Sequence, residues 1–68
     1  MSDYSVGDRV RWHNGEDDTE GIIVEQRTEN FEFNGQLFAA TDDDPTFIVR
    51  SEQSGHTAAH HGRALRKA

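Results

Sequence analysis

The sequence contains no cysteine, a single proline, a single lysine and only short apolar runs. Without cysteine, no disulfide can staple the chain and no thiolate can bind a metal ion. The apolar runs are far shorter than the roughly 20 residues that a helix needs to cross a bilayer. These absences argue against a disulfide scaffold, a thiolate metal centre and a membrane-spanning protein, and they fit a reducing compartment.

The chain is short, with 68 residues of which 32% are hydrophobic. A domain of this size buries only about 60% of the surface that its unfolded chain exposes, so its core must be small. The first residues lack the basic and apolar regions of a signal peptide. We therefore expect a complete cytoplasmic protein, with a flexible leader over residues 1–5 and a single domain over residues 6–68.

Acidic residues dominate the charge: 13 Asp and Glu stand against seven Lys and Arg, giving a formal charge of −6. Such a surface repels anionic membranes, and it repels nucleic acid unless its few cations are clustered. The low lysine content and the many acids fit a salt-adapted organism and a GC-rich genome equally well. Composition thus favours a partner other than a polyanion.

The first predicted strand covers residues 8–13 and opens with a glycine-aspartate turn. Its period-two pattern places Val10 and Trp12 on one face and Arg9 and Arg11 on the other. This alternation is typical of the first strand of a small SH3-like barrel.

The second predicted strand covers residues 19–26, after a polar turn at residues 14–18 that contains Asn-Gly. Branched side chains favour strands because they fit a pleated, half-buried surface. Ile22 and Val24 share one face of this strand, which we expect to be the core face, and Ile23 takes the other.

A further hairpin is predicted at about residues 30–40, where two short alternating runs flank Asn34 and Gly35. The alternation places Phe31 and Phe33 on one face, and an aromatic on the returning arm can meet them. The residues expected to pack this inserted hairpin onto the rest of the domain are Phe31, Phe33 and Phe38.

The remaining elements follow Pro45, which cannot donate to a ladder and therefore belongs at the start of a strand. That strand is expected over residues 46–51, and a last short strand over residues 56–60. Residues 61–65 are expected to form one helical turn with Leu65 inward, before the chain pairs briefly with a sheet edge.

Together these elements predict an all-β fold, a small SH3-like barrel of five or six strands with one short helical turn near the C-terminus. Closing the sheet would remove exposed edges. Trp12 is expected to lie partly in the core. The other expected core residues are Val6, Val10, Ile22, Val24, Phe47, Val49 and Leu65.

The order of these motifs resembles a family described as hypervirulence-associated Tudor-like domain proteins, over about residues 6–67. The resemblance implies a Tudor-like, SH3-type barrel. It brings no catalytic motif, and it does not imply methyl-lysine binding. The motifs that carry it are Gly7–Trp12, Gly21–Val24, Asp44–Val49, Ser54–His56 and Ala64–Leu65.

The aromatic residues allow two interpretations. Several π-faces around a desolvated cation would form a cage for a methylated ammonium group. The favoured alternative is that they fill the core of a very small barrel, with Trp12 as the exception because it ends a strand beside the first loop. The residues concerned are Tyr4, Trp12, Phe31, Phe33, Phe38 and Phe47.

Three arginines are candidates for a basic binding face. Arg9 and Arg11 share the outer face of the first strand, and Arg50 lies on the outer face of the strand over residues 46–51. If these strands lie close together, the three side chains form a patch for nucleic acid. The competing expectation is that Arg9 or Arg11 pairs with Glu20 or Glu25 on the neighbouring strand.

No metal site is expected. His56 and His60 on one strand would lie about 13 Å apart, too far for one metal ion. The acidic runs at residues 16–18 and 42–44 lack the spacing of a calcium loop and are interpreted as solvated loops.

The sequence offers no nucleophile in a strained turn and no phosphate-binding loop, so we expect no enzyme and no cofactor. The predicted function is that of a protein- or peptide-binding module whose partner meets the loop end near Trp12. The alternative is a nucleic-acid-binding barrel that uses Arg9, Arg11 and Arg50. A third, weaker possibility is an accessory protein that acts through self-association; we expect a monomer or a weak homodimer.

Overall fold

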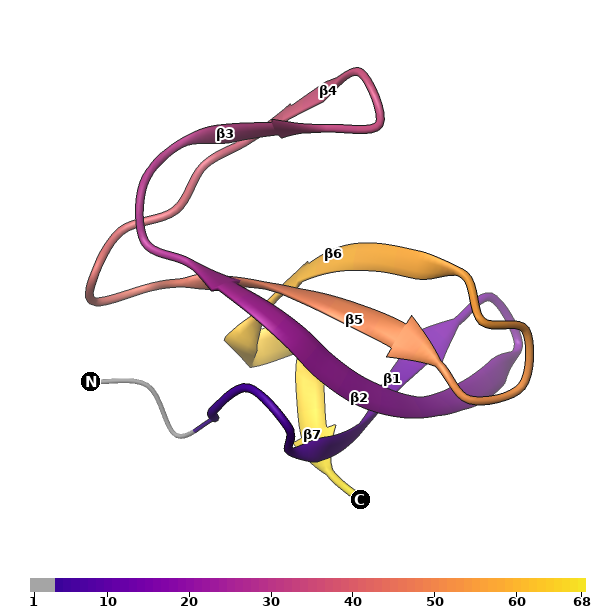
Figure 1. Cartoon of the computed structure of the whole chain (residues 1–68). Helices are drawn as coiled ribbons and strands as arrows, with labels where there is room; N and C mark the ends of the chain where they lie inside the picture. The colour runs from indigo at the N-terminus through magenta and orange to yellow at the C-terminus, as the bar shows by residue number, and fades with distance from the viewer. Residues whose placement is uncertain (1–3) are drawn as a thin grey trace.

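The computed structural model describes residues 4–68, apart from the side chain of Asn14. The main sheet has five antiparallel strands in the order β6-β5-β2-β1-β7, and a separate two-stranded sheet stands beside it (Figure 1). The elements are β1 (Arg9–Asn14), β2 (Asp17–Arg27), β3 (Phe31–Phe33), β4 (Gln36–Phe38), β5 (Thr46–Ser51), β6 (Thr57–His61), the 3-10 turn η1 (Gly62–Ala64) and β7 (Leu65–Lys67).

The fold is all-β with one short helical turn near the C-terminus, as predicted. The main sheet curls so that its two edge strands, β6 and β7, are joined directly by η1 (Figure 1). The hydrogen-bonded ladder stays open between these edges in the part of the chain described, so the curl is that of an SH3-like barrel whose sheet is not closed.

The inserted hairpin is β3–β4, and its turn explains its sequence. Asn34 has φ 53° and Gly35 has φ 76°. A two-residue turn with positive φ at both positions matches the twist of the flanking strands, and asparagine and glycine are the residues that adopt it at low cost. The hairpin predicted around Asn34 and Gly35 is therefore confirmed.

The core lies inside the curl of the main sheet. All of its members are 5% exposed or less, which confirms five predicted positions: Val10, Trp12, Phe47, Val49 and Leu65. Trp12 is more deeply buried than the partial burial that the sequence suggested. The core residues are Val10, Trp12, Ile23, Phe47, Val49 and Leu65.

Three predicted core positions are wrong. Val6, Ile22 and Val24 are 58%, 38% and 44% exposed, and Ile23 is the buried residue of β2. The phase of β2 is set by Gly21, which pairs with Val10 and shares its face, so the following residue points outward. The ladder between β2 and β5 then shifts register after Ile23.

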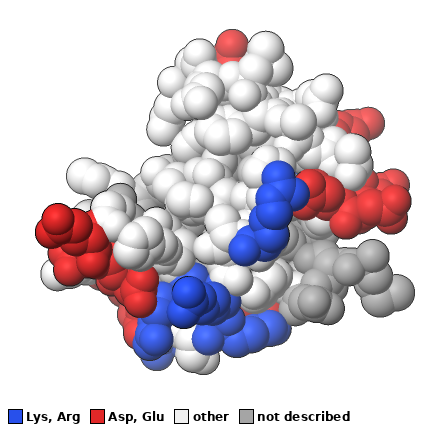
Figure 2. Space-filling model, turned by 180° about the vertical axis from the view of Figure 1, so that it is seen from behind, with Lys and Arg blue, Asp and Glu red and all other residues white. Residues whose placement is uncertain are grey.

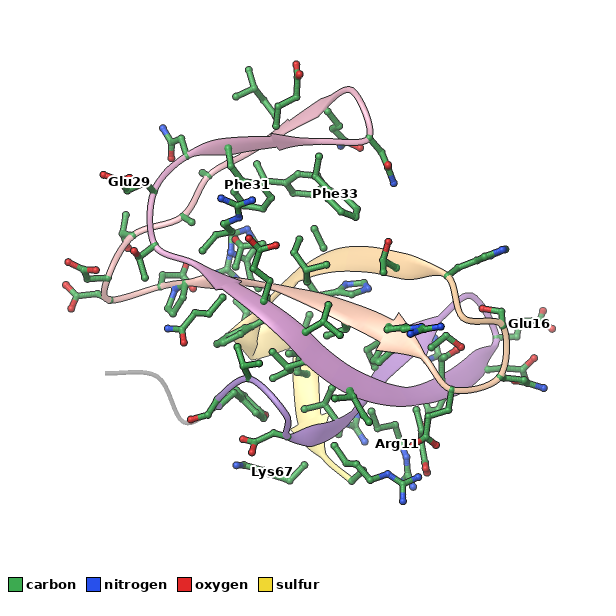
Figure 3. All side chains as sticks on the ribbon, viewed as in Figure 1. Arg11, Glu16, Glu29, Phe31, Phe33 and Lys67 are labelled. Atoms are coloured by element: carbon green, nitrogen blue, oxygen red, sulfur yellow. The ribbon has the colours of Figure 1, made fainter. Side chains whose placement is uncertain are left out.

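A second apolar layer lies on the other face of β5. Ile48 points away from the main core and yet is only 4% exposed. In Figure 3 Phe31 and Phe33 point from the hairpin toward the main sheet, and both are half-buried. Phe38 stacks on Phe31 with ring centroids 5.6 Å apart. The hairpin thus directs its aromatic face at the sheet.

The predicted leader can be compared with the structure only from Tyr4 onward, since residues 1–3 lie outside the described part. Tyr4 packs against the core, and its ring meets that of Phe47 edge-on at 5.8 Å. Its hydroxyl donates to the carbonyl oxygen of Leu65 at 2.9 Å. Across residues 4–68, no helix has the length and apolar character needed to span a membrane.

Candidate functional site

Trp12 forms part of a hollow at the loop end of the domain. The turn after β1 and the loop after β5 lie at the same end of the molecule (Figure 1). Between them is an open depression of about 360 Å³. Trp12 is 5% exposed, so it offers only an edge of its indole to this space. The lining residues are Trp12, Thr19, Ser51, Gln53, Ser54, His56, Thr57 and Ala58.

The wall of this hollow carries short neutral polar side chains. Ser51 Oγ accepts a hydrogen bond from the Ser54 amide at 3.3 Å, and Ser54 Oγ accepts one from the His56 amide at 3.2 Å. These bonds fix the loop between β5 and β6. The hollow therefore combines a hydrogen-bonded rim, an aromatic edge and hydroxyl groups, which suits a peptide backbone or an uncharged side chain.

Arg9 and Arg11 lie on the outer face of β1, and both are bound to acids. Arg11 Nη2 donates to Glu20 at 2.5 Å, while Arg9 Nη2 donates to Glu20 at 3.3 Å and to Glu52 at 2.7 Å. The hydrogen bond and charge of Arg11 lower the pKa of Glu20, and Glu20 in turn raises the pKa of Arg11. The pairing expected with Glu20 is present, whereas Glu25 pairs with Arg27.

Arg50 is separated from the other two candidate arginines. β2 lies between β1 and β5 in the sheet. The register places Arg9 opposite Ile22 and Ile22 opposite Arg50, so an apolar side chain stands between the two cations. The structure thus brings Arg9 and Arg11 together and leaves Arg50 on the far side of β2.

A different basic cluster was missed by the sequence reasoning. Arg66 pairs in register with Arg11, because β7 lies beside β1. Lys67 Nζ lies 3.2 Å from Asp8 Oδ2 and over the Tyr4 ring at 5.1 Å. Figure 2 shows the Lys and Arg side chains gathered at the lower end of one face, with Asp and Glu on both sides. The basic C-terminal run was the only signal for this cluster.

The aromatic residues do not meet in one cage. Tyr4, Trp12 and Phe47 belong to the core or pack against it. The hairpin aromatics contact one another instead, with Phe33 edge-on to Phe38 at 6.4 Å. Among the described residues, the aromatics therefore form two packing clusters.

The histidines of β6 serve two different contacts. His60 is half-buried beside Trp12, with ring centroids 5.7 Å apart. Its burial is the main cause of its lowered pKa, and the charge of the nearby His61 lowers that pKa further. His61 Nδ1 lies 3.2 Å from Thr46 Oγ1, whose hydroxyl donates to Ala39. Because that hydroxyl proton is used, His61 Nδ1 is the donor in this contact. Within residues 4–68, no three acidic or histidine side chains gather as metal ligands.

Comparison with known proteins gives a match to a protein family. No curated protein and no solved structure matches the chain. A family described as "Hypervirulence associated proteins TUDOR domain" matches residues 7–65, which run from the turn before β1 to the first residue of β7. This span contains strands β1 to β6, with the inserted hairpin among them, and η1, in agreement with the resemblance seen in the sequence. The chain therefore belongs to the hypervirulence associated protein TUDOR domain family.

Proposed function

We propose that this protein is a non-catalytic protein- or peptide-binding module of the cytoplasm, and that its partner meets the hollow beside Trp12. The observation that carries the proposal is the hollow itself, where a hydrogen-bonded loop, a tryptophan edge and uncharged polar groups lie at one end of the domain. The absence of cysteine supports the cytoplasmic placement.

The size and shape of the hollow favour a side chain of a peptide over an enclosed substrate. Its volume of about 360 Å³ lies near the lower end of the range for ligand pockets. It is open to solvent, and its wall offers hydroxyl groups and not a charged pair. A short extended segment of a partner fits these features, with one side chain against the Trp12 edge.

Nucleic-acid binding is the second candidate, supported by the cations that gather on β1 and β7 (Figure 2). Two of these cations, Arg9 and Arg11, are already paired with Glu20 and Glu52. A phosphate would therefore have to displace carboxylates on a protein of net charge −6. Because of this competition, we favour a protein partner over nucleic acid.

The burial of Trp12 decides how the proposal is tested. Truncating a buried tryptophan to alanine costs about 3–5 kcal/mol. A domain below about 70 residues has a stability of similar size. Trp12→Ala would therefore unfold the domain instead of isolating the binding site.

Filling the hollow from its exposed rim is the better test. Gln53→Arg places a long charged side chain over the hollow, and Gln36→Arg makes the same change on the exposed hairpin strand β4. We expect a protein partner captured from native lysate to survive nuclease, to be lost with Gln53→Arg and to remain with Gln36→Arg. Equal capture by both variants would contradict the proposal.

The same capture experiment distinguishes the second candidate function, nucleic-acid binding, from the first. Nucleic acid that is retained at low salt and lost in the double variant Arg11→Gln/Arg66→Gln would establish nucleic-acid binding, with an affinity that falls steeply as salt rises.

We also propose that the protein is a monomer or a weak homodimer. Sedimentation over a range of protein concentrations measures this.

A further inference from the structure

The outer face of β2 carries two exposed branched side chains, Ile22 and Val24. They are the residues that the sequence pattern assigned to the core, and they point away from it. They form the apolar part of a second open hollow of about 340 Å³. Its other lining residues are Arg50, Ser51, Glu52 and Gly55. Exposed apolar surface next to polar side chains is typical of an interaction site.

The charge at this hollow is unbalanced. Within residues 4–68, five cations pair with acids, while Arg50 and Arg66 have no such partner. The acid at the rim, Glu52, is already engaged by Arg9 at 2.7 Å. The unsatisfied charge at the hollow is therefore positive and belongs to the Arg50 guanidinium.

That guanidinium lies beside Gly55. Gly55 has φ 76°, and a Cβ built on it would lie 3.7 Å from Arg50 Nη2 and 4.0 Å from Arg50 Nε. The arginine side chain thus runs along the glycine backbone at the edge of the hollow. In register, Arg50 is directly opposite Ile22, so the cation and the apolar surface adjoin.

We propose that this hollow is a second interaction surface, which takes an extended segment of a partner protein that carries one acidic residue beside an apolar one. The segment places a bulky apolar side chain on Ile22 and Val24 and an adjacent carboxylate on Arg50. The inference does not depend on the Trp12 hollow, because the two hollows share only Ser51 in their walls.

The chemistry of the hollow selects this occupant. A carboxylate can accept two parallel hydrogen bonds from a guanidinium, and such charge-assisted bonds are stronger than neutral ones. A polyanion would meet Glu52 and Glu20 as well as Arg50, and its phosphates would gain nothing from the apolar floor. A peptide with one acid beside an apolar residue satisfies both halves of the hollow.

The test selects binders from a library of random peptides and then measures the affinity of enriched peptides for matched variants. Arg50→Gln removes the charge, and Val24→Thr exchanges a methyl group for a hydroxyl while keeping a branched strand residue. The controls are Arg66→Gln, the other arginine without an ion pair, and Leu37→Thr, an apolar residue that is 75% exposed on β4. Thermal melts verify that every variant is folded.

We expect enriched peptides to carry a bulky apolar residue next to Asp or Glu. Their affinity should fall about tenfold or more with Arg50→Gln, as for the loss of a hydrogen bond to a charged group. It should also fall with Val24→Thr and rise as salt is lowered, while both controls bind normally.

Three outcomes would overturn the inference: no enriched peptides, enriched peptides without an acid, or affinities that Arg50→Gln leaves unchanged. Peptides that are lost with Gln53→Arg but not with Arg50→Gln would belong to the Trp12 hollow. That result would leave the proposed function standing and remove the second surface. Retention of single-stranded DNA in place of peptides would contradict both the proposed function and the second interaction surface.

Discussion

The indole of Trp12 occupies the space that any side chain at Gly21 would need, since a Cβ built on Gly21 would lie 2.7 Å from Trp12 Cη2. The same Cβ would overlap the backbone carbonyl oxygen of Arg50. The tryptophan of β1 thus supplies the core volume that β2 lacks at this position. Ile23 is consequently the large apolar side chain that β2 gives to the core.

Gly21→Ala should therefore destabilise the domain by more than about 2 kcal/mol, because the added methyl group meets backbone atoms that cannot rotate away. Gly35→Ala is the matched control. A Cβ there meets nothing within 4 Å, and only its positive φ is unfavourable, which costs about 1 kcal/mol. Urea denaturation of both variants measures the difference, and equal losses would contradict the close packing of Trp12 on Gly21.

Val49→Asp should unfold the domain, since an unpaired carboxylate at a fully buried site costs several kcal/mol. Val24→Asp makes the same change on the neighbouring strand, where the side chain is exposed, and should leave a cooperative melt. The sequence pattern assigned both valines to the core, so this pair separates the structure from the pattern. Circular dichroism melts give the answer, and loss of folding in both variants would favour the pattern.

The strands of this fold were predictable because β-branched residues, period-two alternation and Asn-Gly turns act locally. The strand over residues 46–51 and the turn at Asn34 and Gly35 were located correctly for this reason. The face of β2 was not predictable, because Gly21-Ile22-Ile23-Val24 has apolar side chains on both faces. Deciding between them requires Trp12, which reaches Gly21 only in the folded sheet.

The candidate sites were predictable to a smaller extent. The pairing of Arg11 with Glu20 follows from facing strands with opposite charges, and the sequence indicated it. The separation of Arg50 from Arg9 depends on strand order, which no local pattern shows. The basic cluster on β1 and β7 likewise forms because residues 55 positions apart, Arg11 and Arg66, become neighbours in register.

The stability of the domain should decrease as the pH falls below about 6.5 because of His60. Burial lowers the pKa of this imidazole below its usual 6.5, so the unfolded chain binds a proton at a pH where the folded chain does not. The contribution of neutral His60 is thus complete above pH 6.5 and is lost as the pH falls toward the folded pKa. Thermal melts across this range should show the decrease, and NMR titration of His60 should give a pKa below 6.5.

Replacing His60 tests whether this residue causes the pH dependence of stability. His60→Gln should flatten the pH dependence of the melting temperature, whereas His56→Gln, a change at an exposed histidine, should leave it unchanged. A wild-type melting temperature that is constant from about pH 7 to about pH 5.5 would show that burial of His60 does not control stability in this window.

The hairpin β3–β4 should open independently of the main sheet. The two sheets share no ladder among residues 4–68, and a two-stranded hairpin alone is marginally stable in water. Its stability depends on Phe38, which stacks on Phe31 and meets Phe33 edge-on. Such aromatic pairs contribute about 0.5–1.5 kcal/mol beyond their buried area. Phe38→Ala should therefore accelerate amide hydrogen exchange in β3 and β4 while β1, β2 and β5 stay protected.

Leu37→Ala provides the control for this variant, because Leu37 lies on the same short strand but faces solvent. The amides of β3 and β4 in the Leu37→Ala variant should exchange at the wild-type rate. If Phe38→Ala instead accelerates exchange by the same factor in both sheets, the hairpin and the main sheet unfold as one cooperative unit. In that case the aromatic residues of the hairpin would belong to a single core with Phe47 and Val49.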